Sequence, residues 1–313
     1  MSRIREAEMQ AVFGKIRSLF DRKQQPARVE PRLDSPSASP SGEGIRPMAM
    51  VALSTPGAVA YDALAADLRT RFESLGLAIG PNVAPGEAGG PLMFTLNDLA
   101  LVLMFIDRPI PSPELEEPIS GSRITWKGVR EEIAGHRGHV IVSTLHSGRE
   151  HQGIRDGMVA ISLATASIAA LTSSIGVYWT HARLLTPSAE FIRSCEQQLP
   201  AGQAPIDVWM RIDFMRGRTL PEGQTTIGGF TVGLTPFIGR ELEFVPSPLE
   251  AYVVAQRLLG MGQYLAINGP IVKDGDTFGI DQAERIRARL LPRAEHAHLP
   301  GPVIQLKVEH IRT

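Results

Sequence analysis

The chain has very little cysteine: one residue, Cys195, among 313. A single thiol excludes an intramolecular disulfide and a zinc site built from several cysteines. Cys195 lies in "SAEFIRSCEQQL", a polar amphipathic pattern typical of a helix. We therefore expect an inert thiol on a helix rather than a nucleophile.

The chain also has no excess of one charge. It carries 32 basic and 33 acidic residues, and no basic stripe interleaved with aromatic residues. The balance of charge therefore argues against a general nucleic-acid binder, and we expect no nucleic-acid partner. With 43% hydrophobic and 21% charged residues, the chain has enough apolar material to form a core.

The common catalytic motifs are absent. There is no P-loop, no nucleophile elbow and no kinase signature. The segment "DGDTFG" (274–279) begins like a calcium loop, but Phe278 and Arg285 occupy the fifth and twelfth positions, which need oxygen ligands. We therefore expect no cofactor, and the balance favours a non-enzyme without excluding an enzyme.

No secretory signal or membrane span is predicted. Charged residues stand at the start of the chain, at Arg3, Arg5 and Glu6. One stretch, 157–180, has no charge and is long enough to cross a membrane. It is rich in serine and threonine and ends like a strand, so we expect a buried helix in a cytoplasmic protein.

Composition divides the chain into three regions. Residues 1–22 have apolar residues at three- and four-residue steps, which predicts an amphipathic docking helix. Residues 23–47 are rich in proline and serine and predict a disordered linker, and residues 48–313 form the body. Because a short helix cannot bury its apolar face alone, we expect residues 1–22 to bind a protein partner or to self-associate.

Apolar periodicity predicts the elements of the body. The predicted strands are 48–55, two within 91–106 about a turn at 97–98, then 139–145, 175–180, 206–215, 225–235 and a hairpin at 271–280. The predicted helices are 58–76, one around 124–134, 150–173, 188–199 and 248–267. The order βαββαβ occurs twice, which predicts an α+β fold with two ferredoxin-like halves in tandem, at about 48–146 and 150–313.

Four of the eight histidines fall within "GHRGHVIVSTLHSGREH" (135–151). His136 and His139 are three residues apart, as zinc ligands often are, but they lack the zincin spacing and its glutamate. His139 and His146 are seven apart, so on a strand they face opposite sides. We expect no metal: His139 should be buried with a ring nitrogen bonded to the backbone, and His146 and His151 should be solvated.

A second set of candidates lies further along the chain. Glu241 and Glu243 alternate with Leu242 and Phe244, so both carboxylates should project from one side of a strand. Paired carboxylates can catalyse proton transfer or bind a divalent ion, but a strand with one solvated face explains them more simply. Trp179, at the end of a predicted strand, is the tryptophan that we expect to line a pocket.

Five stretches together resemble a known family. They are "WKGVREEIAGHRGHVIV" (126–142), "GVYWT" (176–180), "DVWMRI" (207–212), "TVGLTPFIGRELEF" (231–244) and "YLAINGPIVKDGDTFG" (264–279). Over roughly 48–279 the chain is similar to a bacterial family known only as a domain of unknown function, DUF4261. The resemblance implies no activity, but it places His136, His139, Trp179, Glu241 and Glu243 on family motifs as candidates for a shared site.

Three functions remain open. The preferred one is a non-enzymatic cytoplasmic protein-interaction or accessory protein that uses the N-terminal helix. The alternative is a metal-assisted hydrolase, which requires His136 or His139 to meet Glu241 and Glu243 in space. A third is a small-ligand sensor that uses a groove between the two halves, since ligand sites favour such junctions.

Overall fold

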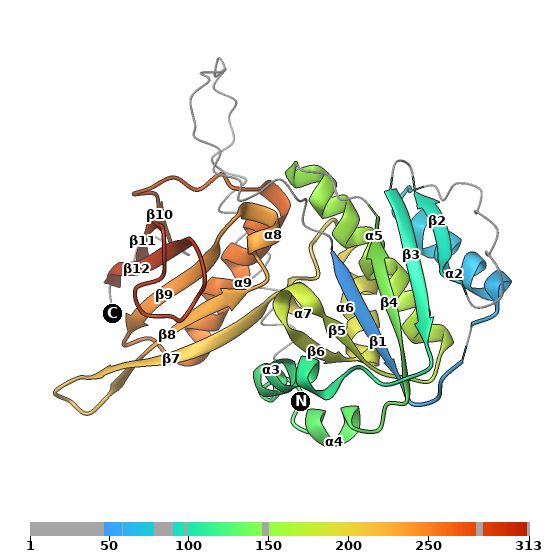
Figure 1. Cartoon of the computed structure of the whole chain (residues 1–313). Helices are drawn as coiled ribbons and strands as arrows, with labels where there is room; N and C mark the ends of the chain where they lie inside the picture. Colours follow the sequence, from blue (N-terminus) through green and yellow to red (C-terminus); the bar gives the residue numbers. More distant parts are fainter. Residues whose placement is uncertain are drawn as a thin grey trace, which may run out of the picture.

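The computed structural model describes residues 47–57, 59–77, 90–96, 99–145, 150–279 and 284–311. The predicted helix at 1–22, the linker at 23–47 except Pro47, the turn at 97–98 and His146 lie outside these residues. Within them, two six-stranded sheets stand side by side (Figure 1).

The first sheet has the strand order β2-β3-β4-β1-β5-β6, and every neighbouring pair is antiparallel. Its strands are β1 (Met48–Leu53), β2 (Leu92–Leu96), β3 (Leu99–Ile106), β4 (Gly138–Thr144), β5 (Ser174–Trp179) and β6 (Leu184–Pro187).

Helices cover both faces of the first sheet. Because side chains alternate along a strand, Val51 and Ala52 of β1 lie in two different apolar clusters. The cluster with Val51 includes α2 (Tyr61–Glu73), α5 (His151–Leu171) and α6 (Ser188–Gln198). The cluster with Ala52 includes α3 (Ser112–Ser122) and α4 (Val129–Ile133), which cover the part of the other face formed by β1, β5 and β6.

The second sheet has the order β10-β11-β12-β9-β8-β7, and its β9–β12 pair is parallel. Its strands are β7 (Arg211–Thr219), β8 (Thr225–Val232), β9 (Glu241–Ser247), β10 (Thr277–Phe278), β11 (Glu284–Leu291) and β12 (Val303–Ile311). One face packs against α9 (Ala251–Asn268), where Gly229 allows the close approach of Val254 and Leu258. Three short helices complete the fold: η1 (Thr180–Ala182), α7 (Ile206–Trp209) and α8 (Thr235–Ile238).

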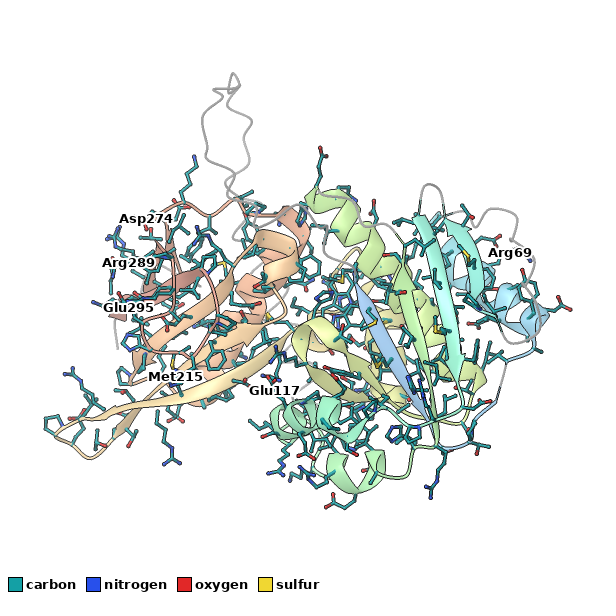
Figure 2. The ribbon with its side chains drawn as sticks, viewed as in Figure 1. Arg69, Glu117, Met215, Asp274, Arg289 and Glu295 are labelled. Atoms are coloured by element: carbon teal, nitrogen blue, oxygen red, sulfur yellow. The ribbon has the colours of Figure 1, made fainter. Side chains whose placement is uncertain are left out.

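The two units share one apolar core. The rings of Trp179 in β5 and Trp209 in α7 stack with centroids 6.2 Å apart, and Trp209 stacks on Phe237 of α8 at 5.4 Å. Beside this stack, buried Arg211 of β7 donates to the backbone oxygen of Arg183 at 2.8 Å. Its guanidinium also lies 3.5 Å from Glu117 of α3, a residue at the junction of the units (Figure 2).

The α+β class is confirmed, but the strand orders do not match two ferredoxin-like units. In such a unit the first strand lies between the third and the fourth. Here β4 lies between β3 and β1, and β1 pairs with β5. The boundary expected near 146–150 is also wrong, because β5 and β6 complete the first sheet. Element order can be read locally from a sequence, whereas strand pairing depends on distant segments.

Two local predictions are also corrected. Residues 271–273 form no strand, so the expected hairpin at 271–280 is absent, and β10 pairs with β11 instead. Between the strands predicted within 91–106 and the helix predicted around 124–134, where no element was expected, the structure has α3, with proline in its first turn. Proline is tolerated there because the first turn needs no N–H donor.

One helix of the described part, α5, is long and apolar enough to cross a membrane by length and composition. However, 72% of its apolar window is buried inside the molecule. The burial agrees with the buried helix expected at 150–173.

Candidate functional site

His136 lies between α4 and β4 and is 6% exposed. Its Nδ1 is 2.5 Å from the backbone oxygen of Ile133, and its Nε2 accepts from the N–H of Ile110 at 2.8 Å. The Nδ1 must therefore be the donor, because the Nε2 accepts. Both ring nitrogens hold backbone groups in place, so neither has a lone pair for a metal.

His139, on β4, behaves as expected. It is 5% exposed, and its Nδ1 donates to the backbone oxygen of Arg108 at 2.8 Å. Burial lowers the pKa of His139, so the ring is neutral at neutral pH. His151 differs from the expectation: it begins α5 and is half-buried, with its Nε2 3.1 Å from the backbone oxygen of Ala266.

Glu241 begins β9 and binds the segment that follows β8. Its carboxylate accepts from the backbone N–H groups of Gly233, Leu234 and Thr235, at 2.9–3.1 Å. It also accepts from the hydroxyls of Thr231 and Thr235. Burial raises the pKa of Glu241, while these five hydrogen bonds favour the charged form. The carboxylate serves as the internal anion for a row of backbone N–H groups.

Glu243, two residues further on, binds a different loop. Its carboxylate accepts from the backbone N–H groups of Glu295, His296 and Ala297 and from the side-chain amide of Gln305. Burial acts to raise the pKa of Glu243, but these hydrogen bonds outweigh it and hold the pKa below its ordinary value. This loop connects β11 to β12.

The two carboxylates lie on one side of β9, but the solvated face expected there is wrong. Glu241 is 9% and Glu243 0% exposed, because the loops that they bind cover them. The histidines contact loops of the first sheet, and the glutamates contact loops of the second, so the structure does not bring the four together. Among the described residues, no group of three or more His, Cys, Asp or Glu side chains could hold a metal ion.

Trp179 lies in the core, where it is 1% exposed between Phe191 and Trp209, and its Nε1 has no hydrogen-bond partner among the described residues. The tryptophan that lines a pocket is Trp209 instead. Cys195 is buried, and burial raises the pKa of its thiol, so it stays protonated as an inert thiol should.

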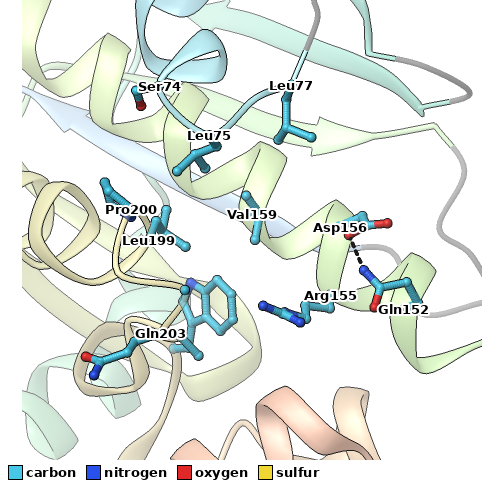
Figure 3. Close-up of a pocket in the computed structure, with 13 residues that line it drawn as sticks. Ser74, Leu75, Leu77, Gln152, Arg155, Asp156, Val159, Leu199, Pro200 and Gln203 are labelled. Carbon is cyan, nitrogen blue, oxygen red and sulfur yellow. Dashed lines mark hydrogen bonds between the residues drawn. The ribbon is translucent and has the colours of Figure 1, made fainter.

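A pocket of about 380 Å³ opens beside Trp209 (Figure 3). Three segments form it: the turn after α2, the first turns of α5 and the loop between α6 and α7. Its apolar walls include Leu75, Leu77, Val159 and Leu199. A volume of this size falls within the range of small-molecule sites.

Arg155 of α5 is the one cation among the described residues that line this pocket. It is half-buried, and its guanidinium makes no hydrogen bond or ion pair with any other residue in the described part of the chain. Figure 3 shows its side chain extending across the pocket toward the loop that carries Gln203. Asp156 does not neutralise it, because that carboxylate accepts instead from the Gln152 amide at 2.7 Å. Among the described residues, the pocket therefore combines apolar walls with one unpaired cation.

This pocket was not predicted from the sequence. Its one local signal is the charged pair Arg155-Asp156 near the start of the otherwise apolar helix predicted at 150–173. Such a pair marks where a helix leaves the core. The remaining walls come from residues 74–77 and 199–204, whose meeting with α5 depends on the tertiary fold.

The geometry defines an α+β protein with two sheets and a pocket in the first unit. Residues 230–307 match the model of a family described as a domain of unknown function, DUF4261. The chain therefore contains a DUF4261 domain, which runs from the end of β8 into β12 and includes Glu241 and Glu243. The motifs with His136 and Trp179 lie outside the match, as does the Arg155 pocket. No curated protein and no solved structure matches the chain.

Proposed function

We propose that this protein is a non-enzymatic binding protein that holds a small molecule in the pocket between α2, α5 and the α6–α7 loop. One observation carries the proposal: a half-buried guanidinium, Arg155, faces apolar walls and has no partner among the described residues. Ligand pockets typically combine apolar walls with a few polar groups that orient the ligand.

The side chains around the pocket favour binding over catalysis. The lining found in the described residues includes no histidine, cysteine or lysine, and the hydroxyl of Ser74 donates to the backbone oxygen of Arg71. The one carboxylate of this lining, exposed Asp156, accepts from the Gln152 amide. General acid–base catalysis needs a titratable group with a free proton or lone pair. Elsewhere, His136, Glu241 and Glu243 use their polar atoms to hold loops.

The pocket borders the junction of the two units. Ala204 lies on its rim, and the amide of Gln263 from α9 pairs with the backbone of Ala204. This position agrees with the ligand sensor considered from the sequence. Binding of a protein partner through residues 1–22 stays a prediction, because these residues lie outside the described part.

Filling the pocket with a larger side chain tests the proposal. The purified full chain is dialysed to equilibrium against a small-molecule extract of cells, and retained compounds are measured by mass spectrometry. Val159→Phe places a larger side chain in the pocket, whereas Ala66→Phe introduces the same aromatic side chain at an exposed position of α2. We expect the parent and the Ala66→Phe variant to retain the same compound, and the Val159→Phe variant to lose it.

The control measurement is a thermal melt of all three proteins, which shows whether each variant folds. If the parent retains no compound, or if the folded Val159→Phe variant retains it as well as the parent does, the pocket is not the binding site and the proposal is wrong.

A further inference from the structure

We propose that the molecule held in this pocket is a small carboxylic acid with an apolar body, whose carboxylate pairs with Arg155. The inference rests on the proposed binding function and adds the chemistry of the ligand. It depends on the number of charges in the pocket, the shape of the guanidinium and the nature of the walls.

The charge in the pocket fits a monoanion. Arg155 is the one cation among the described lining residues, and Asp156 at the rim is negative. A phosphate group carries about 1.5 to 2 negative charges near neutral pH, and it would face a single cation with a carboxylate close by. A carboxylate carries one charge, which Arg155 can balance.

The shape of the guanidinium fits the same group. Its planar fork presents two parallel N–H donors, which match the two oxygens of a carboxylate. Arg155 has these donors free of other described residues. Across the pocket, the side-chain amide of half-buried Gln203 makes no hydrogen bond with another described residue. A neutral amide can bind a ligand oxygen without adding charge.

The walls fit an apolar body. Leu75, Leu77, Val159 and Leu199 contribute side chains without polar atoms, from the turn after α2, from α5 and from the end of α6. A ligand that pairs with Arg155 therefore meets hydrocarbon on the remaining sides. Each methylene that enters such walls should tighten binding about fourfold.

The probes are acetate, butyrate, hexanoate, 1-hexanol and inorganic phosphate, titrated by calorimetry into the full chain at one ionic strength. We expect saturable binding of the carboxylates that tightens from acetate to hexanoate. We expect 1-hexanol and phosphate to bind at least tenfold more weakly than hexanoate, because the first lacks the charge and the second does not fit the single cation and the walls.

Variants of Arg155 separate charge from shape. Arg155→Met keeps the length of the side chain without its charge and should weaken hexanoate binding at least tenfold. Arg155→Lys keeps the charge without the two parallel N–H donors, so its affinity for hexanoate should lie between those of the parent and of Arg155→Met. The matched control is Arg289→Met, because Arg289 is exposed on β11 of the second sheet and has no described partner (Figure 2). It should leave binding unchanged.

The inference is overturned if no carboxylate binds saturably, if phosphate or 1-hexanol binds as tightly as hexanoate, or if a folded Arg155→Met variant binds hexanoate as the parent does. These failures are distinct from failure of the proposed function. A neutral compound retained in dialysis and lost in the Val159→Phe variant would preserve the binding role while excluding the carboxylate.

Discussion

The faces of the two sheets of this protein are covered in different ways. The first sheet has helices on both faces, with apolar side chains at each contact. The second has one long helix, α9, on one face, and loops bound to Glu241 and Glu243 on the other. The comparison shows that a sheet face can be covered by loops when buried anions satisfy the backbone N–H groups that those loops bring with them.

The difference predicts different sensitivities. The stability of the smaller apolar cluster of the first unit depends on buried side-chain volume. Its Trp126 packs against Gly176 of β5. The loop-covered face depends on charge, because six backbone N–H groups donate to two carboxylates. Mutations that remove volume should damage the first unit most. Mutations that remove charge should damage the second, as should a fall in pH that protonates Glu243, whose pKa is lowered in the folded state.

The largest effect is expected from Trp126→Ala. Trp126 is 5% exposed, and its indole N–H donates to Glu132 at 3.0 Å. Truncation leaves a cavity, so the free energy of unfolding should fall by about 3–5 kcal/mol in urea denaturation. The control is Ile124→Ala, at a side chain that is 70% exposed, which should change stability by less than about 0.5 kcal/mol. A loss below about 1 kcal/mol for Trp126→Ala would show that the cluster does not hold α3 and α4.

Glu241→Gln should come next. Both carboxylate oxygens accept hydrogen bonds, so the NH₂ group of glutamine must face N–H or hydroxyl donors. Leaving these buried donors unpaired should lower the free energy of unfolding by about 2–4 kcal/mol. The same change at exposed Glu222, near the tip of the β7–β8 hairpin, serves as the control. Equal stabilities of the two variants would mean that the carboxylate does not anchor the segment at 233–235.

Glu243→Gln should make stability less dependent on pH. Because the pKa of Glu243 is lowered in the folded state, its carboxylate stabilises the fold above its ordinary pKa of about 4.3, and this contribution disappears as pH falls through the lowered value. The variant should be less stable than the parent at pH 7 by about 1–3 kcal/mol, and the gap should close at acidic pH.

Comparing the parent with this variant isolates Glu243. The raised pKa of Glu241 acts in the opposite direction, since its contribution is present below its ordinary pKa and lost as pH rises, and it is common to both proteins. A stability gap that stays constant from pH 7 to acidic pH would contradict the assigned role.

The smallest effect is expected from Thr235→Ala. This change removes one hydroxyl that donates to Glu241 at 2.8 Å and leaves the backbone N–H bond from the same residue in place. The free energy of unfolding should fall by about 1 kcal/mol, as for one net hydrogen bond. Combining it with Glu241→Gln in a double-mutant cycle should give less than the sum of the two losses, and strict additivity would show that the two groups do not interact.

Much of the fold could be predicted because its elements have local periodicity. The strand at 48–55 and the helix at 150–173 lie within a few residues of β1 and α5. The second sheet could not be completed, because residues 281–313 carry no predicted element although they contain β11 and β12. Its central pairing joins β9 to β12 across α9, a contact that no local pattern indicates.

The candidate residues show the same limit. The alternation around Glu241 and Glu243 predicted their common side of the strand, but not the loops that cover them. Glu243 meets the N–H of His296, 53 residues away in the chain. The sequence therefore indicated that the two carboxylates lie on the same side of β9, but their hydrogen-bond partners depended on the tertiary fold. The same limit applies to Arg155, because its lack of a partner among the described residues appears only once the fold is known.

The parallel pairing of β9 with β12 also has a consequence for biosynthesis. β12 lies in the middle of the second sheet, but it is the last of the described strands to leave the ribosome. Until residues 303–311 emerge, β9 exposes an unpaired edge, and the Glu243 carboxylate lacks both its amide partner, Gln305, and the strand that closes its loop. An unpaired edge of this kind favours aggregation, so the protection of β9 depends on the late arrival of β12.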